Sequence, residues 1–514
     1  MPADTATTWA QLVVNVRHDR VHPLTQLPPA HQHQRVINFE SRSHPLVVAW
    51  RTVRTLCTVL SNSMLSAAIA WLLAFCMEHG NVFSGVASRK QSHAVFLTAK
   101  MLWFWVFCWF FTIAECVAKL LPETFTSSPT PSPLSATRIF IKLVRAMFVH
   151  IVLVTVMSVG VGFVIASHHL AHDKFKADVY WPMMCYNFIL TVTDAHTRHI
   201  FRVETVGGQT RAARQSRRVR QPRNELPTAK PRRSPSLSQF LKVFAQNLVL
   251  VISGLSAGAF VHIASSIDMK EKWELVLFAM CSQTVKLLIQ AVAKLYLGKR
   301  KRTPSLRTMA IIVAAPTILV DTQLRTVLLC LDSKAVTLAG SVLLAVAKTA
   351  LRLMTALLMR HQARKVLAKY PAPQDAEGEI RRRLSESMSS PELEGIVRVQ
   401  KLTALHAAEV YADMHGEYIA MCCAYVIIIC FGSNPRFVLG GNASSSSTHE
   451  IQFSTVMVQI GIEVVVDIIA IPLEIRFGVA FERFHKDDAF LAIFMVLVAV
   501  VNIHIASGVY MKSE

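Results

Sequence analysis

Acidic residues are scarce in this 514-residue chain, where 33 Asp and Glu stand against 54 Lys and Arg for a formal net charge of +21. Charged residues of both signs make up only 17% of the sequence, whereas 52% is hydrophobic. Soluble domains carry about 25% charged residues, so this composition excludes an ordinary soluble protein. It is typical of a chain whose helices have lipid as their solvent.

The excess of positive charge would indicate nucleic-acid binding in a soluble protein. Here the Lys and Arg residues concentrate in segments that flank long apolar runs, as they do in the cytoplasmic loops of membrane proteins. We therefore expect no nucleic-acid partner. The partners that the sequence predicts are the lipid bilayer and a small solute or ion.

The sequence also lacks the short motifs of common enzymes. It has no phosphate-binding glycine loop, no nucleophile elbow and no CxxC pair, and its ten cysteines all fall within apolar segments. Cysteines placed in this way exclude a disulfide framework or a zinc ribbon in the loops. We expect them to act as small core residues. The sequence also predicts no cofactor and favours a protein that is not an enzyme.

Long apolar runs dominate what is present. Nine of them approach or exceed the ~20 residues that carry a helix across ~30 Å of hydrocarbon: Cys57–Met77, Ala94–Leu121, Ala146–Ser167, Phe240–Ala264, Trp273–Leu297, Met309–Leu331, Ala335–Met359, Phe453–Leu473 and Ala489–Tyr510. Such runs must be helical in lipid, because unpaired backbone groups find no water there.

Two shorter runs, Val179–Val192 and Tyr418–Phe431, are marginal. The second is intensely apolar, and an amphipathic stretch that begins near Leu393 extends it into a full span. The predicted fold is therefore an all-α, polytopic membrane protein with about eleven transmembrane helices. If Val179–Val192 does not cross, ten helices remain.

Three blocks rich in Lys and Arg set the predicted orientation. They lie in Arg202–Arg233, Lys299–Arg302 and Arg360–Arg383, and cytoplasmic loops carry such an excess. Alternation of eleven spans then places the N-terminus inside, and both the C-terminus and the loop from Gly432 to Gln452 outside. That loop contains a sequon at Asn442, so we expect glycosylation there. With ten spans both termini lie outside.

This orientation divides the chain into six segments. They are a polar cytoplasmic segment (1–55), a membrane bundle of three to four spans (56–200), a basic cytoplasmic loop (201–238), a central four-span bundle (239–360), a cytoplasmic basic loop with an amphipathic helix (361–416) and a three-span bundle (417–514). The protein is expected to be integral to the plasma membrane or an endomembrane.

Charged residues near the middle of apolar runs are the candidate functional residues. Each one costs about 2.5–3.5 kcal/mol at the centre of a membrane helix, so it should face the bundle interior. We predict a polar transport path lined by Lys286, Asp321, Lys348, Glu463 and Asp467. The alternative is that these charges pair only to fix the packing of the helices.

Helical spacing extends this prediction to stripes of polar residues. One contains Gln283, Lys286, Gln290 and Lys294, a second Ser341, Lys348, Arg352 and Thr355, and a third Gln459, Glu463, Asp467 and Glu474. The fourth, His406, Glu409, Asp413 and Glu417, leads into the Tyr418 span from the cytoplasmic side. It would gather cations at an inner vestibule, or else form a solvated helix face.

Two histidine clusters have spacings that suit metal ligands if they are helical. His168, His169, His172 and Asp173 are weak candidates for one metal site, and Asp194, His196 and His199 form the second cluster. If Val179–Val192 crosses the membrane, the clusters lie on opposite faces and cannot share a metal.

The leading functional hypothesis is a transporter or channel for a small solute or ion. Its rivals are a membrane scaffold or receptor-like protein that acts through its cytoplasmic loops, and a membrane-embedded metalloenzyme that uses the histidines.

Overall fold

The computed structural model describes residues 45–126, 132–168, 176–219, 306–329, 334–368, 390–438, 446–479 and 481–512, with isolated positions between 241 and 292. The predicted spans Phe240–Ala264 and Trp273–Leu297 therefore fall largely outside the described residues. So does Asn442, the predicted glycosylation site.

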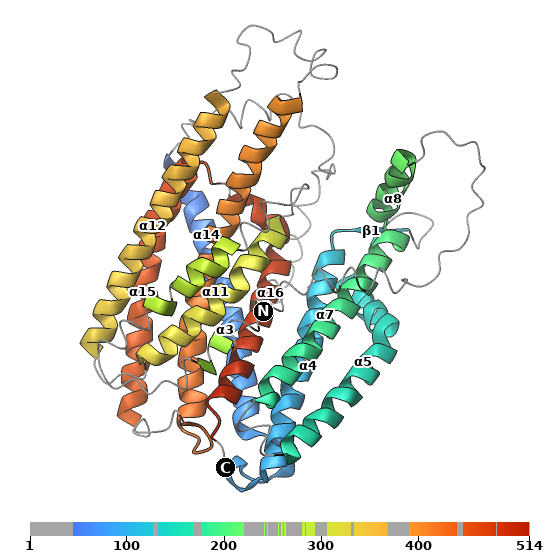
Figure 1. Ribbon diagram of the computed structural model, residues 1–514, viewed down its shortest axis with the longest axis vertical. Helices are drawn as coiled ribbons and strands as arrows, with labels where there is room; N and C mark the ends of the chain where they lie inside the picture. Colours follow the sequence, from blue (N-terminus) through green and yellow to red (C-terminus); the bar gives the residue numbers. More distant parts are fainter. Residues whose placement is uncertain are drawn as a thin grey trace, which may run out of the picture.

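The described chain is almost entirely helical, which confirms the all-α prediction (Figure 1). Its α-helices are α3 (Pro45–His79), α4 (His93–Leu120), α5 (Ala136–Ser167), α7 (Ala177–Glu204), α8 (Val206–Val219), α11 (Leu306–Leu329), α12 (Lys334–Ala368), α14 (Ser390–Gly432), α15 (Ser446–Arg476) and α16 (Asp488–Val509). Three short 3₁₀ helices, η1 (Val82–Ser84), η2 (Ser88–Lys90) and η4 (Phe481–Asp487), and a two-stranded ribbon of β1 (Thr124–Phe125) and β2 (Ser132–Pro133) complete the described elements.

Seven helices in the described part of the chain are long and apolar enough to cross a membrane. They are α3, α4, α5, α15 and α16, with Met309–Thr326 of α11 and Leu402–Gly432 of α14. The predicted number of about eleven spans is therefore not confirmed. Two further helices, α7 with 28 residues and α12 with 35, are long enough to cross but more polar.

Both marginal runs belong to long helices. Val179–Val192 lies inside α7, which packs against α4 and α5. Tyr418–Phe431 is the end of α14, a 43-residue helix that begins at Ser390, close to the predicted start near Leu393. Polar residues make the apolar run short in each case. The helix extends beyond that run because backbone N–H and C=O groups in lipid can be satisfied only by helical hydrogen bonds.

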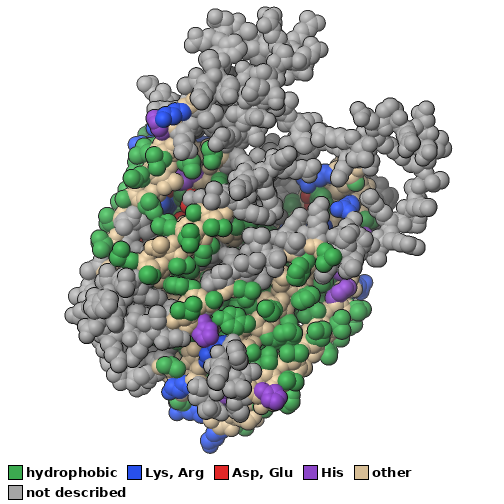
Figure 2. Space-filling model, in the orientation of Figure 1, with side chains coloured by type: hydrophobic (Ala, Val, Ile, Leu, Met, Phe, Trp, Pro, Cys, Tyr) green, Lys and Arg blue, Asp and Glu red, His purple; other side chains and the backbone are tan. Residues whose placement is uncertain are grey.

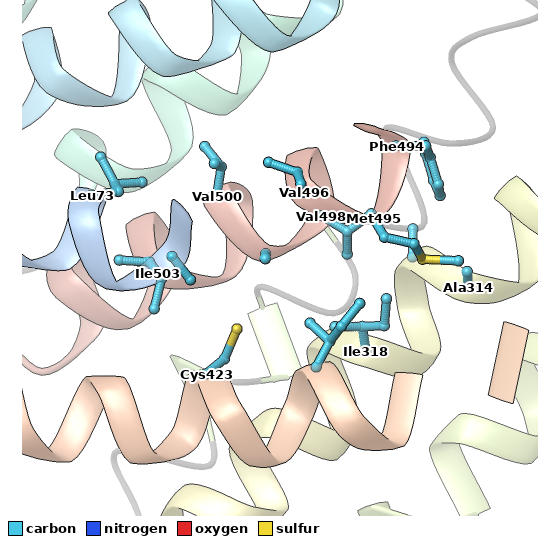
Figure 3. Packing of buried hydrophobic residues seen from close by; sticks show 14 of the residues in the cluster. Leu73, Ala314, Ile318, Cys423, Phe494, Met495, Val496, Val498, Val500 and Ile503 are labelled. Atoms are coloured by element: carbon cyan, nitrogen blue, oxygen red, sulfur yellow. The ribbon is translucent and has the colours of Figure 1, made fainter. Parts of the chain in front are cut away.

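The centre of the molecule is α16, which packs against α3, α4, α11 and α14. Apolar side chains cover it all round, as expected for a helix buried on every side. Figure 3 shows Met495, Val498 and Ile503 of α16 among side chains of α11 and α14. This packing joins the first described helix to the last one.

The opposite case is α5, a peripheral helix with one apolar face left uncovered. Phe148, Val149, Val152, Leu153 and Val156 recur at helical spacing and are all exposed. Figure 2 shows hydrophobic side chains over much of the visible face of the described helices. Such a surface is unfavourable in water but matches the acyl chains of a bilayer.

One end of the bundle carries basic residues, and we call it the basic end. Arg51 near the start of α3 pairs with Glu482 of η4. Lys142 of α5 pairs with Glu204 at the end of α7, and the adjoining helix α8 carries Arg211. In Figure 1 the end of α12 and the start of α14 lie toward this end.

The opposite end, here called the far end, joins three connections. Asn434, just beyond α14, donates a hydrogen bond to the carbonyl oxygen of Glu78 at the end of α3. Beyond α16, the backbone of Lys512 donates to Arg436, and Val438 donates to Tyr510. The α3–α4 connection, the start of the 432–452 loop and the end of α16 therefore share one end, in the alternation that the charge pattern predicts. Which end faces the cytoplasm stays a prediction.

Candidate functional site

The residues Asp321 to Thr326 form a polar segment in the middle of a buried helix, and we call them the polar segment of α11. Five of its six side chains are polar, and each is less than 5% exposed. A membrane helix tolerates so many buried polar groups only when neighbouring helices satisfy them. Partners for these side chains must therefore come from the helices around α11.

On one side the polar segment meets a lysine. Lys286, from the helical stretch at 284–292, donates a hydrogen bond from Nζ to Asp321 Oδ2 at 2.7 Å. Asp413 of α14 approaches the same ammonium group, with 3.7 Å between Nζ and Oδ1. Gln290, one turn after Lys286, donates to Asp413 at 3.0 Å and to Thr317 of α11 at 3.1 Å.

On the other side the polar segment meets an acid. Arg325 Nη2 donates to Glu463 Oε1 of α15 at 3.2 Å, and both side chains are almost fully buried. The sequence places Arg325 four residues after Asp321, a spacing that allows a pair within one helix. In the structure these two charges instead bind partners on different helices.

Uncharged contacts tie the same segment to α16. Asn502 donates a hydrogen bond from its amide to Thr322. Gln323 donates to the hydroxyl of Tyr510, beside the backbone contacts of the far end. The polar segment thus reaches the 284–292 stretch, α15 and α16, and it links the bundle centre to the far end.

A second charged group lies between α12 and α15. Arg352 binds Glu474 through two hydrogen bonds, both of 3.1 Å, and donates a third of 3.1 Å to Asp467. Tyr418 of α14 donates its hydroxyl to the other oxygen of Asp467 at 2.9 Å. A bidentate arginine fixes both distance and orientation, so this group holds three helices in register.

Glu417 of α14 connects the two charged groups. It is 3% exposed, and it interacts electrostatically with both Lys286 and Arg352. Its neighbours along the same helix face are Asp413, one turn earlier, and Tyr418. The charged interior is therefore continuous from Asp413 to Glu474.

Carboxylates outnumber cations in this interior. Among the described side chains there are seven acids to three bases: Asp321, Glu409, Asp413, Glu417, Glu463, Asp467 and Glu474 against Lys286, Arg325 and Arg352. Among these described side chains acids therefore outnumber bases, and a low-dielectric interior disfavours unpaired negative charge unless a cation or proton is bound.

The structure brings four of the five predicted path residues into these groups. Lys286 and Asp321 contact each other, Glu463 binds Arg325, and Asp467 binds Arg352. Lys348 lies on α12, one turn before Arg352, but its side chain is outside the described set. The polar stripes also contained Arg352, Asp413, Glu417 and Glu474.

Other members of the site have no signal in the sequence. Gln323, Asn502 and Tyr510 are uncharged residues that cost little in an apolar run, so hydropathy does not single them out. Lys100 and Asp178 form a further pair of 2.8 Å, fully buried between α4 and α7. Both lie near the ends of predicted spans, where a charge normally reaches water.

The predicted metal ligands do not form a site in the described residues. His168 is exposed at the end of α5, and His169, His172 and Asp173 fall outside the described residues. No group of three His, Cys, Asp or Glu side chains suited to a metal occurs among the residues that the structure describes.

The second histidine cluster lies elsewhere in the molecule. His196 lies edge to face against His150, with 5.1 Å between the ring centroids. His150 precedes His168 by 18 residues of α5, or about 27 Å of helix. His168 and His196 therefore cannot share one metal ion.

Comparisons with protein-family models, with curated proteins and with solved structures gave no match to this chain.

Proposed function

We propose that the chain is a multi-pass membrane transporter or channel that moves a small cation through the polar interior around α11. The observation that carries this proposal is the surplus of buried carboxylates, because it creates a negative potential at the centre of an apolar bundle. A surplus of this sign attracts cations and repels anions.

The arrangement of polar groups supports movement between the two ends. From Glu474 and Arg352 toward the basic end, contacts continue through Asp467 and Tyr418 to the bundle centre. From there the polar segment of α11 leads to Tyr510 at the far end. A cation would exchange one set of oxygen ligands for the next along this line.

Cation flux into proteoliposomes tests the proposal, with Na⁺ and K⁺ as the ions supplied. Asp467→Asn is the informative variant, because Arg352 keeps Glu474 and the amide can still accept from Tyr418. Loss of one carboxylate from the path should lower flux about tenfold, equal to about 1.4 kcal/mol. Glu482→Gln, on the surface, serves as the matched control. Absence of flux in the unaltered protein, or equal flux in Asp467→Asn, rules the proposal out.

A second candidate function has its own supporting observation. Each described cation of the interior, Lys286, Arg325 and Arg352, already has a carboxylate partner. Such pairs suffice to fix helix packing. A scaffold or receptor-like protein acting through its basic loops accounts for them without transport, and it predicts no flux of either ion.

A further inference from the structure

One face of α14 carries a row of a histidine and three carboxylates, which we call the acidic stripe. His406, Glu409, Asp413 and Glu417 are spaced three or four residues apart, so they occupy one helix face with Cβ atoms about 5–6 Å apart. The stripe begins toward the basic end and finishes at Glu417, between Lys286 and Arg352. Like charges at this spacing repel each other.

The first member of the stripe is an unusual histidine. His406 is only 3% exposed, and neither ring nitrogen has a hydrogen-bond partner among the described residues. Its Nδ1 lies 3.8 Å from Glu409 Oε2, too far for a hydrogen bond but close enough for one after a small movement. A buried imidazole without a hydrogen-bond partner is costly and therefore calls for a functional reason, and proton transfer is a common role of histidine.

Charged and titratable groups face the stripe from each helix that packs against it. Lys286 and Gln290 face Asp413 from the 284–292 stretch, and Asp321 faces it from α11. Arg352 of α12 and Asp467 of α15 act on Glu417. Asp488 of α16 contacts Tyr411 on α14 itself, and α3 carries Arg51 and Arg54 near its start, where Arg51 is paired with Glu482. His415 donates a hydrogen bond from Nδ1 to the Tyr411 carbonyl within its own helix.

We propose that His406, Glu409, Asp413 and Glu417 form a proton relay that carries a proton between the basic end and the centre of the bundle. A proton needs only one oxygen or nitrogen at a time, whereas a metal ion needs several converging ligands. Along the relay, each group accepts a proton from its predecessor and releases one to its successor, so charge is conserved at every step. The inference rests on the proposed cation transport and names the proton as an ion that it uses.

Infrared spectroscopy of the full chain in detergent tests the relay without any transport assay. The carbonyl stretch of a protonated carboxylic acid should be present near neutral pH and shift on ¹³C labelling of Asp and Glu. It should weaken in Asp413→Asn and in Glu417→Gln, and stay unchanged in the surface control Glu482→Gln. A pH-jump measurement on His406→Gln should show the same band, formed about tenfold more slowly.

The outcomes separate this inference from the proposed function. Absence of the protonated band in the unaltered chain overturns the relay, even if Na⁺ or K⁺ flux is observed. A band that survives in both carboxylate variants, or an unchanged rate in His406→Gln, overturns it as well. Cation flux that fails while the band behaves as expected overturns the transport proposal and leaves proton binding in place.

Discussion

Arg325 is a buried charge that depends on a partner on another helix. Its guanidinium lies within the polar segment of α11, and its partner Glu463 lies at the middle of α15. Neither side chain reaches water, so each charge is tolerated because the other compensates it. Removing one partner costs far more than removing both.

We therefore expect Glu463→Gln to destabilise the folded protein by about 3–5 kcal/mol, because it leaves the positive guanidinium of Arg325 buried without its carboxylate partner. Thermal unfolding in detergent measures this loss. The double variant Glu463→Gln with Arg325→Met removes both charges and should recover most of the stability. Equal melting temperatures for the single variant and the parent would show that this pair does not stabilise the bundle.

At the level of helices, the approach of α7 to α16 depends on a small residue. Gly508 of α16 lies against Val179 of α7, and a methyl group added at Gly508 would overlap that side chain. Asp178 and Lys100 flank the same point. The two helices can come this close because Gly508 has no side chain, as at many helix contacts in membranes.

Gly508→Ala should accordingly destabilise the protein by about 1–3 kcal/mol through overpacking. Gly160→Ala, in the exposed part of α5, is the matched control, since a methyl there meets no atom within 4 Å. The control should keep or raise stability, because alanine favours a helix over glycine. Melting temperatures of the two variants give the comparison, and similar losses in both would refute close α7–α16 packing.

The sequence predicted helices better than it predicted contacts. Apolar runs identified α3, α4, α5, α15 and α16, because lipid forces any such run to be helical. Asp321 and Glu463 also stood out, because charges are rare in apolar runs. Lys286, the partner of Asp321, was predicted as well. The pairing of Arg325 with Glu463 rather than with Asp321 was not, because it depends on how the helices face each other.

At the scale of the whole molecule, both ends carry described basic side chains. The basic end has Arg51, Lys142 and Arg211, and the far end has Arg89, Lys90 and Arg436. The orientation therefore rests on the predicted cytoplasmic blocks, of which α8 and the end of α12 are described. By the positive-inside rule, we expect the basic end to face the cytoplasm. Asn442 follows Val438 in the loop that begins at the far end, so it stays our proposed glycosylation site.

Cysteine labelling in intact cells tests this orientation. In a cysteine-free background, Val86→Cys and Val438→Cys at the far end should react with a reagent that does not cross membranes. Arg211→Cys at the basic end should react only after the membrane is opened. Labelling of Arg211→Cys together with Val438→Cys in intact cells would contradict the orientation and, with it, a crossing by α7.

The central place of α16 has a consequence for how the chain is made. α3 ends at His79, and its neighbour α16 begins at Asp488, so the ribosome synthesises everything between them before the two can meet. Contacts so distant in sequence form late. Until then, the faces of α3, α4 and α11 that will enclose α16 must be covered by lipid or by a membrane chaperone. The helix bundle therefore stays unassembled, and open to membrane-protein quality control, for most of the time of synthesis.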